Sequence, residues 1–274
     1  MRLAHLPVEF HGGDVRDSEA LGKALRGCSS VVHLAAIAIE KSGQGYADVN
    51  TEATKTLIAA ARSAGVERLV FTSQNGADSR SPHAFLRSKG LAQDAVTQSG
   101  LAYTVLRPSV IFGPEDEFIN VLGRLVKLTP FVFPLPDGGK ARFQPVAVTD
   151  VAKAIRLSLE SKAARGAVYA LGGPSPLTLR EMTEIIFAAM GTSRTIVGVP
   201  ASALRPLLAF VARVIPNPPV TPELLDLLSL DNTVPENALT ETFGVAPIPF
   251  APDELHYLRR ITVSSALHSL FERR

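Results

Sequence analysis

The stretch SPHAFLRSKG, residues 81–90, carries residue types from which proton chemistry could be built. Three residues separate an aromatic side chain, Phe85, from Lys89. A phenol in the aromatic position could give or take a proton, because the Lys ammonium would stabilise the phenolate. Phe85 has no hydroxyl and cannot do this, and the loss of a general acid costs roughly 10²–10⁴ in rate. Tyr103 could replace it only if the fold brought that phenol to the same place.

Small and polar residues follow the strands that the sequence predicts. Ligands of parallel sheets bind beyond the carboxyl ends of the strands. The residues at these ends are Asp14, Ala35–Ala36, Thr72–Ser73 and Arg107–Pro108. We therefore expect a ligand site along this edge of the sheet.

The first half of the chain alternates strand-like and helix-like segments. The predicted strands are 7–15, 29–36, 67–73 and 102–108, and the predicted helices are 17–27, 50–65 and 84–100. Asp17 or Ser18 is the expected N-cap of the first helix. This alternation with short turns predicts an α/β fold, a doubly wound parallel sheet of the Rossmann type.

The rhythm changes after Pro108. We expect a partial dinucleotide-binding domain over 1–110, to which segments 143–155 and 166–172 return. A smaller, mainly helical lobe is expected over 111–274, with two short strands around the turn PDGG at 136–139. It would bind the substrate or a partner.

One segment of this lobe, residues 201–216, is mostly apolar and has no acidic residue. It carries Arg205, Arg213 and an internal Pro206. One interpretation is a core helix kinked near the Pro. The alternative is a helix that lies on a membrane or on a partner protein.

Composition limits the function. The 274 residues are 46% hydrophobic, and the net charge is +2 without any run of like charges, which gives no case for nucleic acid as a partner. The single Cys28 fits a reducing compartment. No signal peptide and no membrane-spanning run are predicted, so we expect a cytoplasmic protein.

Several motifs are absent. No G-x-G-x-x-G follows a strand, and GQGYAD at 43–48 places Asp48 where it would repel a phosphate. There is no Walker A, G-x-S-x-G or H-E-x-x-H sequence, and the six His show no familiar metal spacing, so no metal is expected.

Six segments in order carry a resemblance. They are GDVRD (13–17), VVHLAA (31–36), VNTEATKTLIAAARSAGVERLVFTS (49–73), FLRSK (85–89), LRPSVIFGPED (106–116) and FQPVAVTDVAKAI (143–155). Together they resemble the extended and atypical short-chain dehydrogenase/reductase superfamily, in its NAD-dependent epimerase/dehydratase group. The branch that they resemble includes a nucleotide-binding accessory subunit of respiratory complex I.

The resemblance implies a bound NAD or NADP. Asp14 and Val15 would meet the adenine, and Ala35 and Ala36 would lie beside the ribose and pyrophosphate. Asn50 matches a buried Asn that helps to fix the site, although taken alone it is most simply a helix N-cap. Arg107 and Pro108 match the segment that leads to the nicotinamide.

The catalytic positions are carried over in the same way. Lys89 matches the Lys that binds the nicotinamide ribose and lowers the pKa of the catalytic Tyr, whose position is taken by Phe85. The catalytic Ser or Thr would be Ser73 or fall at Gln74. We expect weak or absent redox chemistry by the usual mechanism.

A second departure concerns the start of the family fold. The family opens with a strand, a Gly-rich turn, a helix and a second strand, a unit of very roughly 45 residues that is missing here. We expect either a natural start upstream of Met1 or direct pairing of strands 7–15 and 29–36. The residue that separates NAD from NADP belongs to that unit.

Three functions fit these residues. The first is a dinucleotide-binding accessory, assembly or sensing protein, which would contact a membrane-associated complex through its C-terminal lobe, at the inner face of the membrane. The second is an active epimerase, dehydratase or reductase on a sugar nucleotide or a small carbonyl compound. The third is a scaffold that binds no cofactor.

Overall fold

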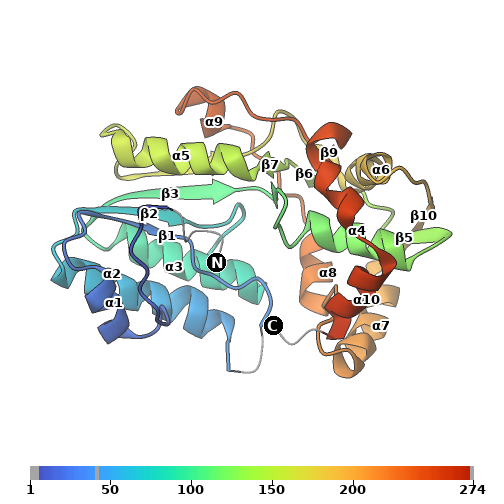
Figure 1. Cartoon of the computed structure of the whole chain (residues 1–274), viewed down its shortest axis with the longest axis horizontal. Coiled ribbons are helices and arrows are strands. Elements are labelled where there is room, and N and C mark those ends of the chain that lie inside the picture. The colour runs from blue at the N-terminus through green and yellow to red at the C-terminus, as the bar shows by residue number, and fades with distance from the viewer. Residues whose placement is uncertain (1–5, 41–42, 272–274) are drawn as a thin grey trace. The chain divides into compact units, whose positions relative to one another are not determined.

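The computed structural model describes residues 6–40 and 43–271 (Figure 1). The chain divides into two compact units. Unit 1 comprises Met1–Ser73, Ala77–Leu106 and Ser158–Val168. Unit 2 comprises Gln74–Gly76, Arg107–Leu157 and Tyr169–Arg274.

The chain contains a four-stranded sheet. Its strands are β1 (Ser30–His33), β2 (Arg68–Thr72), β3 (Ala102–Pro108) and β8 (Ala167–Leu171), in the order β1-β2-β3-β8. β1, β2 and most of β3 belong to unit 1. β2 pairs in parallel with both β1 and β3, and its first four residues are buried. A strand covered on both faces reads as a continuous apolar run, as LVF does here. The α/β fold with a parallel sheet is confirmed.

Helices connect these strands by the expected crossovers. α1 (Ser18–Ala24) precedes β1, α2 (Ala53–Ser63) joins β1 to β2, and α3 (Ala84–Thr97) joins β2 to β3. The core between them is formed by apolar side chains of the sheet and of α2 and α3, among them Ala61, Leu69, Phe71, Val96 and Val105. Burial of these residues in one contiguous cluster stabilises the unit.

The helix ends follow the sequence signals. The Asp17 side chain accepts hydrogen bonds from the backbone N–H groups of Glu19 and Ala20, so it is the N-cap of α1. Gly65, with a φ of +73°, follows the C-cap of α2 and takes a backbone conformation that side chains disfavour.

The predicted strand over 7–15 is wrong. No strand is present among residues 6–29, and Val8 and Phe10 are about half exposed. Among the described strands β1 pairs only with β2, so direct pairing between 7–15 and 29–36 is also wrong. A strand is stable only when its backbone groups find partners, and this segment has no neighbouring strand.

Unit 2 has its own apolar core. It contains α4 (Ile119–Leu128), α6 (Leu179–Ala189), the 3₁₀ segment η2 (Pro252–Arg260), α8 (Pro222–Leu228), α9 (Ala238–Glu241) and most of α5 (Val148–Glu160). Buried side chains of α4, α6 and η2 form the largest part of this core, among them Ile119, Val126, Met182, Ile186 and Leu258.

The short strands of unit 2 pair across long sequence separations. β5 (Val132–Pro136) pairs with β10 (Thr195–Val199), β4 (Ile111–Phe112) with β7 (Val146–Ala147), and β6 (Arg142–Phe143) with β9 (Leu177–Thr178). Gly138 and Gly139 in the PDGG turn have positive φ as expected. The strands that flank the turn, β5 and β6, do not pair with each other, because each has a more distant partner.

Two helices of unit 2 are unusually exposed. No residue of α7 (Ala201–Val214) is buried, and α10 (Val263–Phe271) buries only Ala266. The interpretation of 201–216 as a core helix is therefore wrong, and the helix continues through Pro206. Within the described part of the chain, no helix combines the length and the apolar character needed to cross a bilayer.

Candidate functional site

A buried Lys lies at the carboxyl end of β2. Lys89, in the second turn of α3, is 4% exposed, and its Nζ donates a 2.8 Å hydrogen bond to the backbone oxygen of Thr72. Nζ also lies 4.9 Å from the centroid of the Phe71 ring. Burial disfavours the charged form and lowers the pKa of Lys89 from 10.5 to about 8. The amine is therefore largely protonated at neutral pH, although it lies in an apolar surrounding.

Two hydroxyl groups at the same strand end are buried. Thr72 Oγ1 and Ser73 Oγ have no hydrogen-bond partner among the described residues. A buried hydroxyl without a partner is costly, and native structures usually satisfy it with water or a ligand. The Lys89 ammonium and these two hydroxyls thus come from residues at or next to the carboxyl end of β2.

A Gly fixes the approach of α3 to the loop that follows β2. A Cβ atom at Gly90 would lie 2.2 Å from the carbonyl carbon of Asp78 and 2.2 Å from the backbone nitrogen of Ser79. Such distances are sterically forbidden, so only Gly permits this packing. Because Gly90 follows Lys89 directly, the close contact also fixes the backbone of Lys89.

Phe85 lies one turn before Lys89 on α3. Its ring packs against the ring of Tyr46, with centroids 5.7 Å apart and an interplanar angle of 59°. The Tyr46 hydroxyl donates a 2.9 Å hydrogen bond to the backbone oxygen of Ala38. The Phe85 ring therefore makes an aromatic contact and offers no hydroxyl one turn before Lys89.

Tyr103 does not replace the missing phenol. It pairs with Leu69 in the register of β2 and β3, three residues before Thr72. Three residues of strand span roughly 10 Å. The Tyr103 backbone therefore lies too far from the carboxyl end of the sheet for its hydroxyl to take the role that Phe85 lacks.

Asn50 connects two segments of the site. It belongs to a π-helical segment, η1 (Ala47–Glu52), which continues into α2. Asn50 Oδ1 accepts a 2.8 Å hydrogen bond from the Ile37 N–H, and Nδ2 donates to the Ile37 oxygen at 3.1 Å and to Ser88 Oγ at 3.0 Å. The interpretation as an N-cap is therefore wrong. π-Turns inside helices occur frequently at functional sites.

Ala35 and Ala36 lie in the loop that follows β1. The loop is held by the two Ile37 contacts of Asn50, while Ala36 itself is exposed and Ala35 half-buried. Methyl side chains on a fixed backbone allow close approach of a ligand. Asn50 therefore joins this loop to Ser88, the residue before Lys89.

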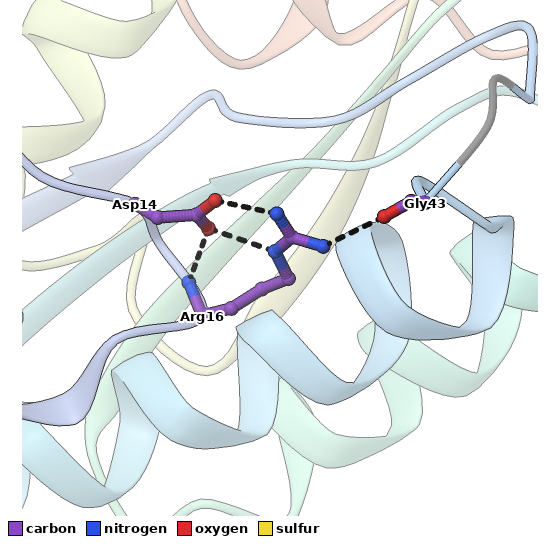
Figure 2. A network of polar contacts seen from close by, with 3 residues as sticks. All are labelled: Asp14, Arg16 and Gly43. Carbon is purple, nitrogen blue, oxygen red and sulfur yellow. Dashed lines mark hydrogen bonds and ion pairs between the residues drawn. The ribbon is translucent and has the colours of Figure 1, made fainter.

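Asp14 is engaged by a residue of its own segment (Figure 2). Arg16 Nε donates to Asp14 Oδ1 at 2.9 Å and Nη2 to Oδ2 at 2.6 Å, while Arg16 Nη1 donates to the Gly43 oxygen at 3.0 Å. The hydrogen bonds from Arg16 lower the pKa of Asp14 to about 2. Val15, between the two, is half-buried. Both carboxylate oxygens of Asp14 are thus already bound.

Arg107 and Pro108 belong to unit 2. Arg107 Nε donates to the Gln74 oxygen at 3.3 Å, and the Pro108 oxygen accepts from the Asn75 N–H at 3.0 Å. These bonds hold the segment 74–76 against the end of β3. Gln74, the alternative position for the catalytic hydroxyl, is thus a backbone acceptor in unit 2, whereas Ser73 lies with Lys89 in unit 1.

His33 is a core residue at the end of β1. Its ring stacks on Phe71 with centroids 5.5 Å apart, and Nε2 lies 3.0 Å from Thr54 Oγ1. Burial and then the charge of Lys89 lower the pKa of His33 to about 4. The imidazole is therefore neutral at physiological pH.

The structure brings several predicted residues together in unit 1 and adds others. Lys89 binds the backbone of Thr72, the residue before Ser73, and Asn50 reaches the same turn of α3 through Ser88. Sequence reasoning missed Ser88, Arg16 and Gly90. A Gly in the middle of a predicted helix was a signal for the last of these, whereas nothing marked the other two.

Comparisons with known proteins agree with this geometry. A family model described as NAD(P)H-binding matches residues 2–126. Subunit 9 of the NADH dehydrogenase [ubiquinone] 1 alpha subcomplex from Arabidopsis thaliana is 31% identical over 244 residues, which cover 85% of this chain and 60% of the relative. The chain spans 67% of the Mus musculus subunit and 49% of the Dictyostelium discoideum one. A 2-alkyl-3-oxoalkanoate reductase from Stenotrophomonas maltophilia is 26% identical, and the match covers 93% of this chain and 86% of the reductase.

Solved structures share the fold. The UDP-glucose 4-epimerase of Thermus thermophilus in complex with NAD has a TM-score of 0.69 at 22% identity, covering 97% of this chain and 87% of that one. A dTDP-glucose 4,6-dehydratase from Streptomyces venezuelae has a TM-score of 0.68 at 24% identity, covering 94% and 80%. The chain thus shares the fold of these epimerases and dehydratases, and its residues 2–126 match the NAD(P)H-binding family model. In sequence it is similar to the alpha subcomplex subunit 9 proteins.

Proposed function

We propose that this protein binds NAD or NADP at the carboxyl end of its parallel sheet and works as an accessory, assembly or sensing protein with little or no redox turnover. The observation that carries the proposal is the pair Phe85 and Lys89. The Lys is buried and bound to Thr72, while the aromatic ring one turn earlier lacks a hydroxyl and packs on Tyr46. The proposed binding group is thus present, and the aromatic residue one turn earlier has no hydroxyl to carry a proton.

Each residue has a distinct part in the proposed site. Lys89 and Ser73 would hold the nicotinamide ribose through the ammonium and the partnerless hydroxyl. Ala35 and Ala36 would lie against the ribose and pyrophosphate, on a loop fixed by Asn50. Asp14 and Val15 would meet the adenine, and Arg107 and Pro108 would lead to the nicotinamide. When bound, the dinucleotide supplies hydride chemistry, for which Phe85 provides no acid.

The proposal extends to where the protein works and what it contacts. Relatives that cover most of this chain are named as mitochondrial subunits of NADH dehydrogenase. We propose a membrane-associated protein complex as the partner, contacted through the C-terminal part of the chain at the inner face of the membrane.

A titration with NADH and NADPH tests the binding half of the proposal. The wild-type protein should quench or shift the nicotinamide fluorescence, and Lys89→Met should weaken binding about 10-fold or more, since a hydrogen bond to a charged group contributes roughly 1.5–3 kcal/mol. Lys55→Met, which removes an exposed Lys of α2, is the matched control and should bind normally. Wild-type protein that stays folded and binds neither nucleotide would leave the cofactor-free scaffold as the better account.

An active reductase is the second candidate. It is favoured by the 2-alkyl-3-oxoalkanoate reductase, of which the chain covers 86%. This function requires another proton donor than Phe85, and Tyr103 lies too far along β3 to be one. Turnover of NADPH with a 3-oxo acid would decide in its favour.

A further inference from the structure

The outer face of α7 is apolar and exposed. Its half-buried residues recur every three to four positions, at Ala201, Leu204, Leu208 and Val211, and the helix packs on α8 through this side. On the adjoining flank of the helix Leu207, Phe210 and Val214 are all more than half exposed, with 66% for the Phe. On a protein surface, an exposed row of large apolar side chains indicates a region that contacts something else.

α10 repeats this arrangement within the same unit. Val263, Leu267 and Phe271, spaced by four residues, are exposed, while Ala266 is buried and the helix packs on α4. Asn217, three residues beyond α7, donates from its backbone N–H to the Leu270 oxygen at 3.0 Å and from Nδ2 to the Ser269 oxygen at 2.7 Å. The C-terminal ends of α7 and α10 are therefore held together (Figure 1).

The two helices carry no acidic residue. Neither α7 nor α10 contains an Asp or a Glu, whereas α7 carries Arg205 and Arg213. Arg205 is bound to Asp226 of α8. Arg213 is exposed and has no ion-pair partner among the described residues, one position before the exposed Val214. An apolar row bordered by Arg and free of acid is complementary to an anionic, apolar surface.

We propose that the α7–α10 face, defined by Leu207, Phe210, Val214, Val263, Leu267 and Phe271 with Arg213, binds directly to a bilayer that contains anionic phospholipids. α7, with 14 residues, is roughly 21 Å long and would lie in the plane of the interface. The apolar side chains enter the boundary of the acyl chains, and Arg213 reaches the headgroups. This inference deepens the membrane part of the proposed function, and its test needs neither a dinucleotide nor a partner protein.

A single fluorophore gives the most direct test. The chain contains no Trp, so Phe210→Trp in the full-length protein places the only indole at the centre of the α7 row. Vesicles of phosphatidylcholine with phosphatidylglycerol should shift its emission to shorter wavelength, and vesicles of phosphatidylcholine alone should shift it much less. Phe131→Trp is the matched control, because Phe131 is 81% exposed in the same unit but lies outside both helices. Its emission should stay unchanged.

Partitioning measured by vesicle sedimentation supplies the second arm. Phe210→Ser should lower the partition coefficient about 10- to 100-fold, because a buried Phe contributes roughly that factor. Phe131→Ser should change it less than about twofold. Raising the ionic strength from about 0.1 M to about 1 M should weaken wild-type binding, because the Debye length falls from about 10 Å to about 3 Å.

Three results would overturn the inference. One is an unshifted indole emission of the Phe210→Trp protein with both vesicle types. Another is equal partitioning of wild type and Phe210→Ser. The third is a dimer in sedimentation velocity that Phe210→Ser dissociates while vesicles bind neither form, which would assign the face to a second copy. A loss of nucleotide binding leaves all three readouts untouched, so the two proposals fail separately.

Discussion

Lys89 Nζ donates a 2.8 Å hydrogen bond to the backbone oxygen of Thr72, and this bond ties the second turn of α3 to the carboxyl end of β2. At the same strand end, two buried hydroxyls, Thr72 Oγ1 and Ser73 Oγ, have no hydrogen-bond partner among the described residues. A buried hydroxyl without a partner is costly, and native structures usually satisfy it with water or a ligand.

The pH dependence of stability should report the buried amine. The pKa of Lys89 is about 8 in the folded protein and 10.5 when unperturbed. Between these values the unfolded state binds more protons, so the free energy of unfolding should rise with pH, by up to about 3 kcal/mol. Below pH 8 both states are protonated and the contribution is flat. Urea unfolding of the wild type and of Lys89→Met from pH 7 to 10 measures this contribution. It is the difference between the free energies of unfolding of the two proteins at each pH. A constant difference would show that the amine is solvated.

Removal of the Ser73 hydroxyl should lower nucleotide affinity without lowering the stability of the fold. Ser73→Ala deletes a buried group that gains nothing in the free protein, so the free energy of unfolding should stay within about 1 kcal/mol or increase. NADH affinity should fall about 3- to 10-fold, because the ribose loses a hydrogen bond. Ser99→Ala, at a buried Ser whose Oγ accepts from the Leu101 N–H, is the control and should lose stability without losing affinity. Unchanged NADH affinity in Ser73→Ala would remove Ser73 from the site.

The Asn50 connection should matter for both fold and site. Asn50→Ala removes three hydrogen bonds at a residue that is 2% exposed and leaves the Ile37 backbone groups without these partners, so the free energy of unfolding should fall by about 2–4 kcal/mol. Amide exchange in the loop 34–40 should accelerate. Thr56→Ala, at a half-buried residue of α2 whose Oγ1 donates only to the Glu52 backbone oxygen, should change stability by less than about 1 kcal/mol. Equal stability of the two variants would contradict the role given to Asn50.

Two Gly-to-Ala changes in helices should have opposite signs. Gly90→Ala forces a Cβ into the backbone of Asp78 and Ser79, so α3 must shift and both stability and nucleotide binding should fall. Gly22→Ala, in α1, meets no atom within 4 Å and should stabilise the protein by up to about 1 kcal/mol. Thermal unfolding monitored by circular dichroism distinguishes them. A neutral Gly90→Ala would show that the contact of α3 with this loop is loose.

Much of the fold could be predicted because its signals are local. The apolar run LVF at 69–71 and the Gly at 65 marked β2 and the end of α2 without any knowledge of the rest of the chain. The segment 7–15 has a strand-like pattern, but no neighbouring strand pairs with it, and pairing is not a local property. β5 and β6 likewise flank a well-formed turn and pair elsewhere.

The site was predictable only in part, for the same reason. The position of Lys89 came from a motif, and its burial follows from the packing of α3. The contacts of Asn50 depend on a π-turn and on Ser88, which lies 38 residues away. Arg16 neutralises Asp14 from two positions away, yet nothing in the sequence required its side chain to fold back.

The most direct test of the central claim is NADPH turnover by the wild-type protein beside Phe85→Tyr, at saturating nucleotide with a carbonyl substrate. We predict nucleotide binding by both proteins and turnover by the wild type far below an ordinary enzymatic rate of about 10 s⁻¹. Phe85→Tyr should raise turnover, by up to about 10²–10⁴-fold, because it returns a phenol one turn from Lys89. Wild-type turnover at an ordinary rate would contradict the claim that the dinucleotide site is kept without its proton donor.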